Sequence, residues 1–291
     1  MEIKRVIPSG YCKGVVHAIK LAEETRKNNP QDKIHVLGMI VHNSFVTDEL
    51  ARIGIITLDD SSKTKEELLD EISEGIVIFT AHGISDCIKQ KALDKGLRIV
   101  DASCEDVLKT REIVKKHLAE GYDILYFGKR NHPEATAILS ISPKIHLITS
   151  KEDIDALEIT NSKLLLTNQT TMSYLELEEY FDYAITKYPH IKIIEEICNA
   201  TSSRQKAISE LDDCDLLYVV GDIKSNNTSK LKDIAISKGI PKVLMISSYQ
   251  EINKKDLIGI NKVYVTAGAS TPPKLINEVM DHLNLLGTEL S

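Results

Sequence analysis

The amino-acid sequence predicts an α/β fold made of three pseudo-repeated small α/β domains with parallel sheets. The first observation is that Cys12, Cys104 and Cys198 stand at nearly equal intervals along the 291 residues. The second is that short aliphatic and β-branched runs alternate with segments whose apolar residues recur at helical spacing. Strands that alternate with helices favour parallel sheets covered by helices.

The elements of each repeat follow the same order along the chain. A strand-like run precedes each cysteine, at residues 5–8, 97–103 and 191–197. An amphipathic helical segment follows each cysteine, at residues 13–27, 105–120 and 199–213. Next comes a strand that ends in glycine, at residues 33–38, 123–128 and 215–221, and later one that ends in threonine, at residues 75–80, 163–167 and 261–266. We therefore expect domains at residues 12–101, 102–195 and 196–291, the last completed by a strand from residues 1–11.

The repeated cysteines indicate a metal site. In parallel α/β sheets, ligands bind beyond the carboxyl ends of the strands, where these cysteines are expected. Three converging thiolates would bind a soft metal and leave one coordination position free for chemistry. A single cysteine before a helix is usually a small buried residue, but three at matching positions favour the metal site. Cys87 and Cys214 match nothing in the other repeats, and we predict a structural role for both.

Polar side chains that can bind an anion follow the predicted strands in all three repeats. They are His42, Asn43, His82, His132, Glu134, Gln169, Thr170, Thr171, Ser225, Asn226, Asn227 and Ser270. Histidines, hydroxyls and amides near helix starts donate hydrogen bonds to a phosphate or diphosphate. Glu134 is the carboxylate that we place centrally, as a proton donor beside the open metal position. The alternatives are helix capping by Thr170, Thr171 and Ser270 and core hydrogen bonding by the histidines.

Composition excludes several classes of protein. The net charge of −7 argues against general nucleic-acid binding, which needs a basic face. No apolar run approaches the roughly 18 residues of a membrane span, and the start of the chain lacks the apolar core of a signal peptide. Five cysteines without a secretory signal favour metal or redox use. We expect a cytoplasmic protein without a membrane partner, and the absence of a flavin or nicotinamide fingerprint implies an external electron donor.

Sequence segments along essentially the whole chain carry a family resemblance. They read GYCKGVVHAI, VHNSFV, TAHGIS, DASC, NHPE, NQTTMS, EICNATSSRQ, SNN and TAGAS. Taken in this order, they resemble the 4-hydroxy-3-methylbut-2-enyl diphosphate reductase family of the non-mevalonate isoprenoid pathway.

The resemblance implies an oxidoreductase with a [4Fe–4S] cluster, held by Cys12, Cys104 and Cys198 with one open iron, in a central position among the three domains. It implies the conversion of (E)-4-hydroxy-3-methylbut-2-enyl diphosphate to isopentenyl and dimethylallyl diphosphate by reductive dehydroxylation. The electrons would come from ferredoxin or flavodoxin. The implied substrate-binding residues are His42, His82, His132, Thr170, Ser225, Asn226, Asn227 and Ser270, and the implied catalytic residues are Glu134, His132 and Thr170.

Three positions depart from the family pattern and keep alternatives open. Glu105 stands where the family usually has proline, Asn226 where it commonly has a second serine, and Ala137 where it tends to have glycine. A divergent relative that acts on another allylic diphosphate or anion is one alternative. A non-redox iron–sulfur hydro-lyase, an iron–sulfur sensor without catalytic activity and a plain zinc site are the others.

Overall fold

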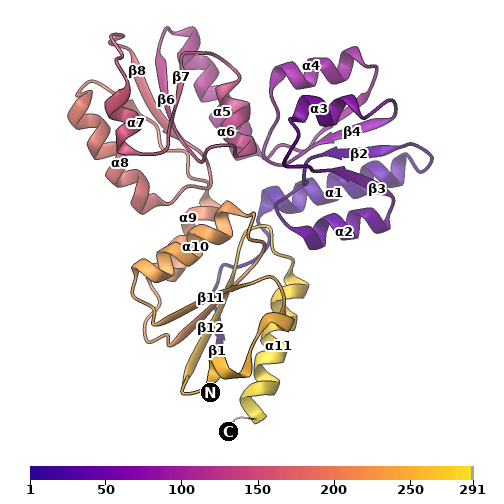
Figure 1. The fold of residues 1–291 in the computed structure, drawn as a ribbon, viewed down its shortest axis with the longest axis vertical. Coiled ribbons are helices and arrows are strands. Elements are labelled where there is room, and N and C mark those ends of the chain that lie inside the picture. The colour runs from indigo at the N-terminus through magenta and orange to yellow at the C-terminus, as the bar shows by residue number, and fades with distance from the viewer. Residues whose placement is uncertain (290–291) are drawn as a thin grey trace. The chain divides into compact units, whose positions relative to one another are not determined.

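The structure is a computed structural model that describes residues 1–289. Within this range, the strands form three four-stranded sheets in which all neighbouring strands are parallel. Helices flank each sheet (Figure 1). The predicted α/β class with parallel sheets is therefore confirmed.

The first sheet has the strand order β3-β2-β4-β5. Its strands are β2 (Ile34–Leu37), β3 (Ile55–Leu58), β4 (Ile76–Phe79) and β5 (Arg98–Asp101), and the helices of this part of the chain are α1 (Lys13–Asn28), α2 (Ser44–Arg52), α3 (Lys65–Asp70) and α4 (Asp86–Asp94). All four residues of β4 are buried because the strand is central and covered on both faces. Leu69, Val77 and Phe79 lie in the apolar cluster that joins this sheet to α3 and α4.

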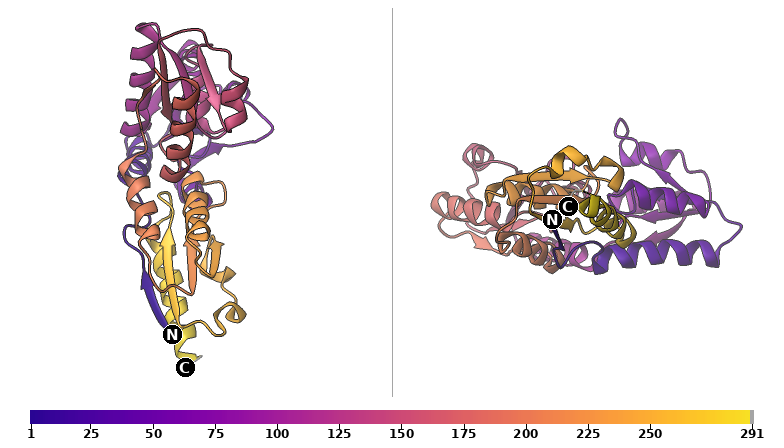
Figure 2. Two further views of the ribbon diagram at one scale, coloured as in Figure 1. Left: turned by 90° about the vertical axis from the view of Figure 1, so that its left-hand side faces the viewer. Right: turned by 90° about the horizontal axis from the view of Figure 1, so that it is seen from below.

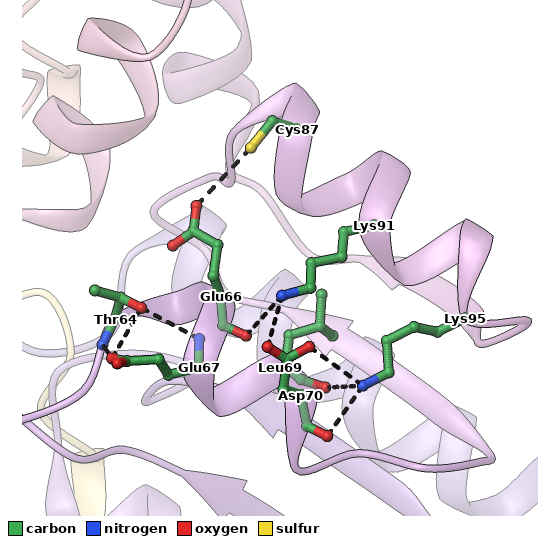
Figure 3. Close-up of polar contacts among 8 residues, drawn as sticks. All are labelled: Thr64, Glu66, Glu67, Leu69, Asp70, Cys87, Lys91 and Lys95. Carbon is green, nitrogen blue, oxygen red and sulfur yellow. Dashed lines mark hydrogen bonds and ion pairs between the residues drawn. The ribbon is translucent and has the colours of Figure 1, made fainter.

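Polar contacts hold α3 against α4 at the surface of this sheet (Figure 3). Thr64 and Glu67 form a capping box that starts α3, since each side chain bonds to the backbone N–H of the other. From α4, Lys91 Nζ lies 2.7 Å from Asp70 Oδ2, and Lys95 Nζ donates to the carbonyl oxygens of Leu69 and Asp70 at 2.9 and 3.0 Å. The two bonds from Lys95 satisfy backbone carbonyls at the C-terminal end of α3, where a helix has no N–H donors of its own for its last carbonyl oxygens.

The second sheet has the order β7-β6-β8-β9. Its strands are β6 (Asp123–Phe127), β7 (Ile145–Ile148), β8 (Leu164–Asn168) and β9 (Lys192–Ile193), and its helices are α5 (Glu105–Ala119), α6 (Pro133–Leu139), α7 (Lys151–Ala156) and α8 (Tyr174–Lys187). Successive residues of β6 belong to two different apolar clusters, one with Leu125 and Phe127 and the other with Ile124 and Tyr126. This alternation follows from the period of two in a strand and shows that both faces of the sheet are covered.

The third sheet has the order β1-β12-β10-β11. Its strands are β1 (Glu2–Arg5), β10 (Leu216–Val220), β11 (Lys242–Ile246) and β12 (Lys262–Ala267), and its helices are α9 (Asn199–Ser209), α10 (Asn226–Ser237) and α11 (Pro273–Glu289). Two short 3₁₀ helices, Tyr249–Glu251 and Lys254–Leu257, precede β12. The strand from the start of the chain and the last helix, α11, lie side by side (Figure 2).

Several elements differ from the sequence-based expectation. The edge strands β3, β7 and β11 were not predicted, because they are not among the strands that the repeated cysteines, glycines and threonines mark. The first strand occupies residues 2–5 rather than 5–8, since Pro8 has no N–H for a strand ladder. The run at 191–197 forms only the two-residue strand β9, and the helix predicted at 199–213 ends at Ser209.

The chain divides into two compact units. The first unit contains Met1–Val15, His42–Ser44 and the chain from Asn199 onward, and the second contains Val16–Val41 and Phe45–Cys198. The division into domains at 12–101, 102–195 and 196–291 stays a prediction. Over residues 1–289, no helix is long and apolar enough to cross a membrane.

Candidate functional site

Glu134 is a buried carboxyl group at the start of α6 in the second unit. Its side chain is 1 % exposed. The backbone N–H of Thr170 donates to Oε1 at 2.8 Å, and the Thr170 hydroxyl donates to Oε2 at 2.9 Å. The hydroxyl of Tyr126, in the middle of β6, donates to Oε1 at 3.3 Å. Residues from β6, α6 and the loop after β8 therefore meet at one carboxyl group.

The protonation of Glu134 is shifted by its surroundings. Burial raises its pKa from 4.5 to about 7, although the hydrogen bonds from Thr170 and Tyr126 lower it and the nearby charge of Asp106 raises it. Loss of hydration is the largest of these effects, so about half of the molecules carry a proton on this carboxyl group near pH 7. A carboxylic acid in this state can act as a general acid.

Two histidines lie beside this acid. His132 is the N-cap of α6, and its Nδ1 accepts a hydrogen bond from the Glu134 N–H at 3.2 Å. Its ring packs edge-on against the ring of His82, with centroids 5.5 Å apart. His82 comes from the loop after β4, so the ends of the first two sheets contribute to the same group of side chains. Both histidines, Glu134 and Thr170 are site residues predicted from the sequence, and the structure brings these four residues together.

Two of the three repeated cysteines are tied to this group by backbone bonds. The N–H of Cys104 donates to the carbonyl of Ala81 at 2.9 Å, next to His82. The N–H of Cys198 donates to the carbonyl of Thr170 at 3.1 Å. Cys104 is the N-cap of α5, and its Sγ lies 3.8 Å from Asp106 Oδ2. Both thiols are half-buried and belong to the same compact unit as Glu134.

The first compact unit gathers the remaining predicted residues. Ala269 connects Cys12 to Asn227, because its carbonyl accepts from the Cys12 N–H at 3.1 Å while its N–H donates to Asn227 Oδ1 at 3.1 Å. Asn227 Nδ2 in turn donates to the hydroxyl of Thr201 at 2.9 Å. The hydroxyl of Ser270 donates to the carbonyl of His42 at 2.9 Å. Asn227 thus has a fixed orientation at the start of α10.

The start of α10 carries three consecutive polar residues. Ser225 is the N-cap, and its hydroxyl accepts from the N–H of Thr228 at 3.3 Å. Asn226 and Asn227 form the first turn, and all three side chains are about 5 % exposed or less. The first N–H groups of a helix have no acceptor within the helix and favour anions. Ser225 therefore caps α10. The capping alternative is wrong for Thr170 and Thr171, because the N-cap of α8 is Ser173.

The five cysteines differ in their suitability as metal ligands. Cys12, Cys104 and Cys198 are half-buried thiols outside disulfide bonds, and each stands directly before the first residue of a helix. Cys214 is buried in an apolar cluster, and burial raises its pKa to about 11. Cys87 is exposed on α4, where its Sγ lies 3.8 Å from Glu66 Oε1 (Figure 3). The thiolate chemistry of the first three fits an iron–sulfur cluster.

Over residues 1–289, no single cluster of side chains forms a complete metal site. In the part of the chain that the structure describes, no three His, Cys, Asp or Glu side chains are grouped so that they could hold a metal ion. Cys12 belongs to one compact unit, and Cys104 and Cys198 belong to the other. The convergence of the three thiols therefore stays a prediction.

Sequence reasoning missed the residues that hold this site in place. Tyr126, Thr201 and Asn168 were not selected, yet the first two contact Glu134 and Asn227 directly. Asn168 is completely buried at the end of β8, and its Oδ1 accepts from the N–H of Glu196, two residues before Cys198. A tyrosine inside an apolar strand looks like an ordinary core residue, whereas a buried asparagine at a strand end is a signal that could have been used.

These features define an α/β enzyme with a buried acid, buried polar residues at a helix start and three thiols that each precede a helix. The model of the LytB protein family matches residues 3–284, and the chain belongs to this family. The reductases of this family are iron–sulfur enzymes.

Relatives named 4-hydroxy-3-methylbut-2-enyl diphosphate reductase match nearly the full chain. The protein of Exiguobacterium sibiricum is 42% identical over 288 residues, which cover 97% of this chain and 91% of the relative. The protein of Listeria monocytogenes is 44% identical over 283 residues, which cover 96% of this chain and 85% of the relative. The predicted family and the predicted oxidoreductase class are thus confirmed.

Solved structures agree with this assignment. The E-1-hydroxy-2-methyl-but-2-enyl-4-diphosphate reductase of Plasmodium falciparum has a TM-score of 0.89 and 32% identity, and the match covers 98% of this chain and 87% of that chain. An (E)-4-hydroxy-3-methyl-but-2-enyl diphosphate reductase described as the terminal enzyme of the non-mevalonate pathway has a TM-score of 0.68 and 30% identity, with coverage of 98% and 100%.

Proposed function

We propose that this chain is an iron–sulfur reductase that converts (E)-4-hydroxy-3-methylbut-2-enyl diphosphate to isopentenyl diphosphate and dimethylallyl diphosphate by reductive dehydroxylation. The single observation that carries this proposal is the buried Glu134 carboxyl group, whose pKa is raised to about 7 mainly by burial. Reductive loss of a hydroxyl needs a proton donor, because hydroxide is a poor leaving group until it is protonated. The names of the relatives supply the substrate.

The cofactor in this proposal is a [4Fe–4S] cluster held by Cys12, Cys104 and Cys198, with one iron free of protein ligands. When bound, it would supply electrons one at a time and a Lewis-acid position for the substrate hydroxyl. The three thiols support this assignment because they are outside disulfide bonds, half-buried and placed before helix starts, unlike the buried Cys214. Cys87 and Cys214 have no part in cluster binding.

The diphosphate is held by the imidazole, hydroxyl and amide donors of the strand-end loops. These residues are His42, His82, His132, Ser225, Asn226, Asn227 and Ser270. The start of α10 supports this assignment, because buried hydrogen-bond donors and free backbone N–H groups are combined there. The bond from Asn227 to Thr201 would keep the amide oriented while an anion binds.

Protons are delivered at the other end of the substrate. Glu134 donates the proton that leaves with the hydroxyl group as water, while Thr170 holds the carboxyl group through two bonds and His132 lies directly before it. Two electrons from the external donor and a second proton, which adds to either end of the allylic carbon chain, complete the reduction to the two products. Because the site acid is buried, water does not compete for its proton.

Electrons reach the protein from outside. We propose ferredoxin or flavodoxin as the donor and the cytoplasm as the location, since the sequence carries no flavin or nicotinamide fingerprint. The net charge of −7 speaks against a nucleic-acid partner.

The experiment is an anaerobic assay of cluster-loaded protein with the hydroxylated C5 diphosphate and a one-electron donor. We expect both C5 diphosphate products to form, and to form only when reductant is present. Substrate consumption without reductant would instead identify a hydro-lyase. If cluster-loaded protein forms neither product, the enzyme is the divergent relative to which Glu105, Asn226 and Ala137 pointed.

A further inference from the structure

Tyr126 places a polar group inside an apolar cluster. Its side chain is fully buried on β6, among residues that include Ile124, Ala135 and Ile138. A buried hydroxyl without a partner costs free energy, and Glu134 Oε1 is the acceptor that removes this cost. Burial, followed by the nearby charge of Glu134, raises the pKa of Tyr126 well above its ordinary value, so the phenol stays protonated and donates.

The ring of Tyr126 has little freedom to move. A Cβ atom added to Gly128 would lie 3.0 Å from Tyr126 Cε1 and 3.3 Å from Gln169 Oε1, so the chain passes close to the ring at the end of β6. The hydroxyl therefore has a fixed position relative to the carboxyl group.

The two carboxyl oxygens of Glu134 accept different numbers of hydrogen bonds. Oε1 accepts two bonds, from the Thr170 N–H at 2.8 Å and from the Tyr126 hydroxyl at 3.3 Å. Among the residues that the structure describes, Oε2 accepts one bond, from the Thr170 hydroxyl at 2.9 Å. A carboxylate oxygen has two lone pairs in its plane, so both are used on Oε1 and one is left on Oε2.

We propose that Tyr126 is a positioning residue of the reductase: together with the Thr170 N–H it occupies Oε1 of Glu134 and leaves Oε2 as the oxygen that carries and delivers the proton. Proton delivery to the substrate rests on the proposed function, but the hydrogen-bond geometry of the carboxyl group does not depend on it. No covalent step is added, because Tyr126 keeps its own proton throughout.

The proposal has a measurable consequence for the titration of Glu134. The groups that face the carboxyl are Tyr126 on β6, Thr170 after β8, the charge of Asp106 on α5, and His132 at the start of α6, which itself contacts His82. The Tyr126 bond favours the ionised carboxylate. Its removal should raise the pKa of Glu134 by roughly one pH unit, which corresponds to the loss of one hydrogen bond to a charged group.

The main test is Tyr126→Phe in the cluster-loaded, full-length protein. Two midpoints are measured: the carboxyl titration of Glu134, from infrared difference spectra against Glu134→Gln, and the fall in turnover at high pH. We expect both midpoints to move upward by roughly one pH unit. In the Glu134→Gln background, Tyr126→Phe should have no further effect on turnover, because the tyrosine acts through the acid.

Tyr218→Phe is the matched control. Tyr218 is also fully buried in a central strand, β10, and within residues 1–289 its hydroxyl has no hydrogen-bond partner. The same loss of one oxygen should therefore leave the Glu134 titration and the pH profile unchanged. If Tyr126→Phe does not fold, 3-fluorotyrosine placed at position 126 gives a stronger donor and should lower the Glu134 midpoint.

Three results would show whether the positioning role or the proposed reductase function is wrong. Unchanged midpoints in a well-folded Tyr126→Phe protein, or in the fluorinated protein, would overturn the positioning role. An upward infrared midpoint in protein that forms no C5 product would support the positioning of Glu134 and reject the proposed reductase function. Equal shifts in Tyr126→Phe and Tyr218→Phe would show a general packing effect and would also overturn the inference.

Discussion

Glu134 illustrates how opposing effects at a single residue set its chemistry. Burial removes water from the carboxyl group and raises its pKa, while three hydrogen bonds from Thr170 and Tyr126 lower it. Burial has the larger effect, so the pKa settles at about 7 instead of near 4.5. An acid with this pKa can both release and recover a proton at neutral pH, which a general acid needs in every turnover.

Glu134→Gln should abolish most of the reductase activity. The amide keeps the shape and can accept from the Thr170 N–H, but it has no proton to donate. We expect turnover to fall by roughly 10²-fold or more, with a small change in KM. Glu178→Gln, at an exposed position on α8, is the control and should keep full activity. Similar turnover in the two variants would remove Glu134 from the mechanism.

The same residue should make the stability of the protein depend on pH. The pKa of Glu134 is raised in the folded state, so its contribution to stability is complete below about 4.5 and is lost as the pH rises through about 7. Relative to Glu134→Gln, the wild-type protein should lose about 3 kcal/mol of unfolding free energy over this interval. Urea unfolding at several pH values measures both proteins, and parallel pH curves would contradict the prediction.

The sequence revealed the reactive residues better than the residues that hold them. Glu134, Thr170, His132 and His82 were recognised because they follow predicted strands, where parallel sheets bind ligands, and the structure brings them together. Tyr126 was missed because its hydroxyl lies in a run of apolar residues and depends on a contact with a different element.

Among the elements, the central strands and the edge strands before the three cysteines were predicted, whereas the edge strands β3, β7 and β11 were missed. β4 and β10 are buried along their whole length and read as continuous apolar runs. β3 and β11 stand at sheet edges with partly exposed residues, so burial leaves a weaker pattern in their sequences. A strand whose existence depends on pairing with a neighbour cannot be recognised from its own residues alone.

The close contact between β12 and α10 depends on Gly268. A Cβ atom at this position would lie 2.0 Å from Thr228 Oγ1 and 3.3 Å from the Thr228 Cα, which belongs to the helix backbone. Gly268→Ala should therefore displace the start of α10 and cost roughly 1–3 kcal/mol of stability, as overpacking does. Urea unfolding measures this loss.

Thr228→Ala is the control for this contact. Within residues 1–289, the Thr228 hydroxyl has no hydrogen-bond partner, so its removal alone should cost little. The double variant Gly268→Ala with Thr228→Ala should recover part of the lost stability, because the closest atom is gone. Strictly additive losses would show that the contact between residues 268 and 228 is not the cause.

At the scale of the whole chain, the three sheets share one topology. In each, the strand that precedes a repeated cysteine pairs at the edge with the strand that ends near a threonine: β5 with β4, β9 with β8, and β1 with β12. Each cysteine therefore lies between an edge strand of one sheet and the helix that follows it in the chain. The sequence displays this order through its regular cysteine spacing, but spacing alone cannot tell whether three thiols bind one metal cluster.

The threefold repeat predicts how the iron content of the protein changes when single cysteines are replaced. If each repeat contributes one thiolate to a common cluster, Cys12→Ala, Cys104→Ala and Cys198→Ala should each lose most of the roughly four iron atoms per chain expected for a [4Fe–4S] cluster. Iron and sulfide analysis after anaerobic reconstitution measures this content. The cluster binds only the folded chain, so the same variants should also lose the increase in melting temperature that loading produces.

Cys87→Ala and Cys214→Ala are the internal controls, because one removes an exposed thiol on α4 and the other a thiol within an apolar cluster. Both should keep their iron, and Cys214→Ala should lower the stability of loaded and unloaded protein equally, since it affects packing alone. Loss of iron from either control, or full iron in one of the three ligand variants, would mean that the repeat reflects architecture and not a shared metal site. The pattern across five single variants thus separates the two interpretations without any measurement of turnover.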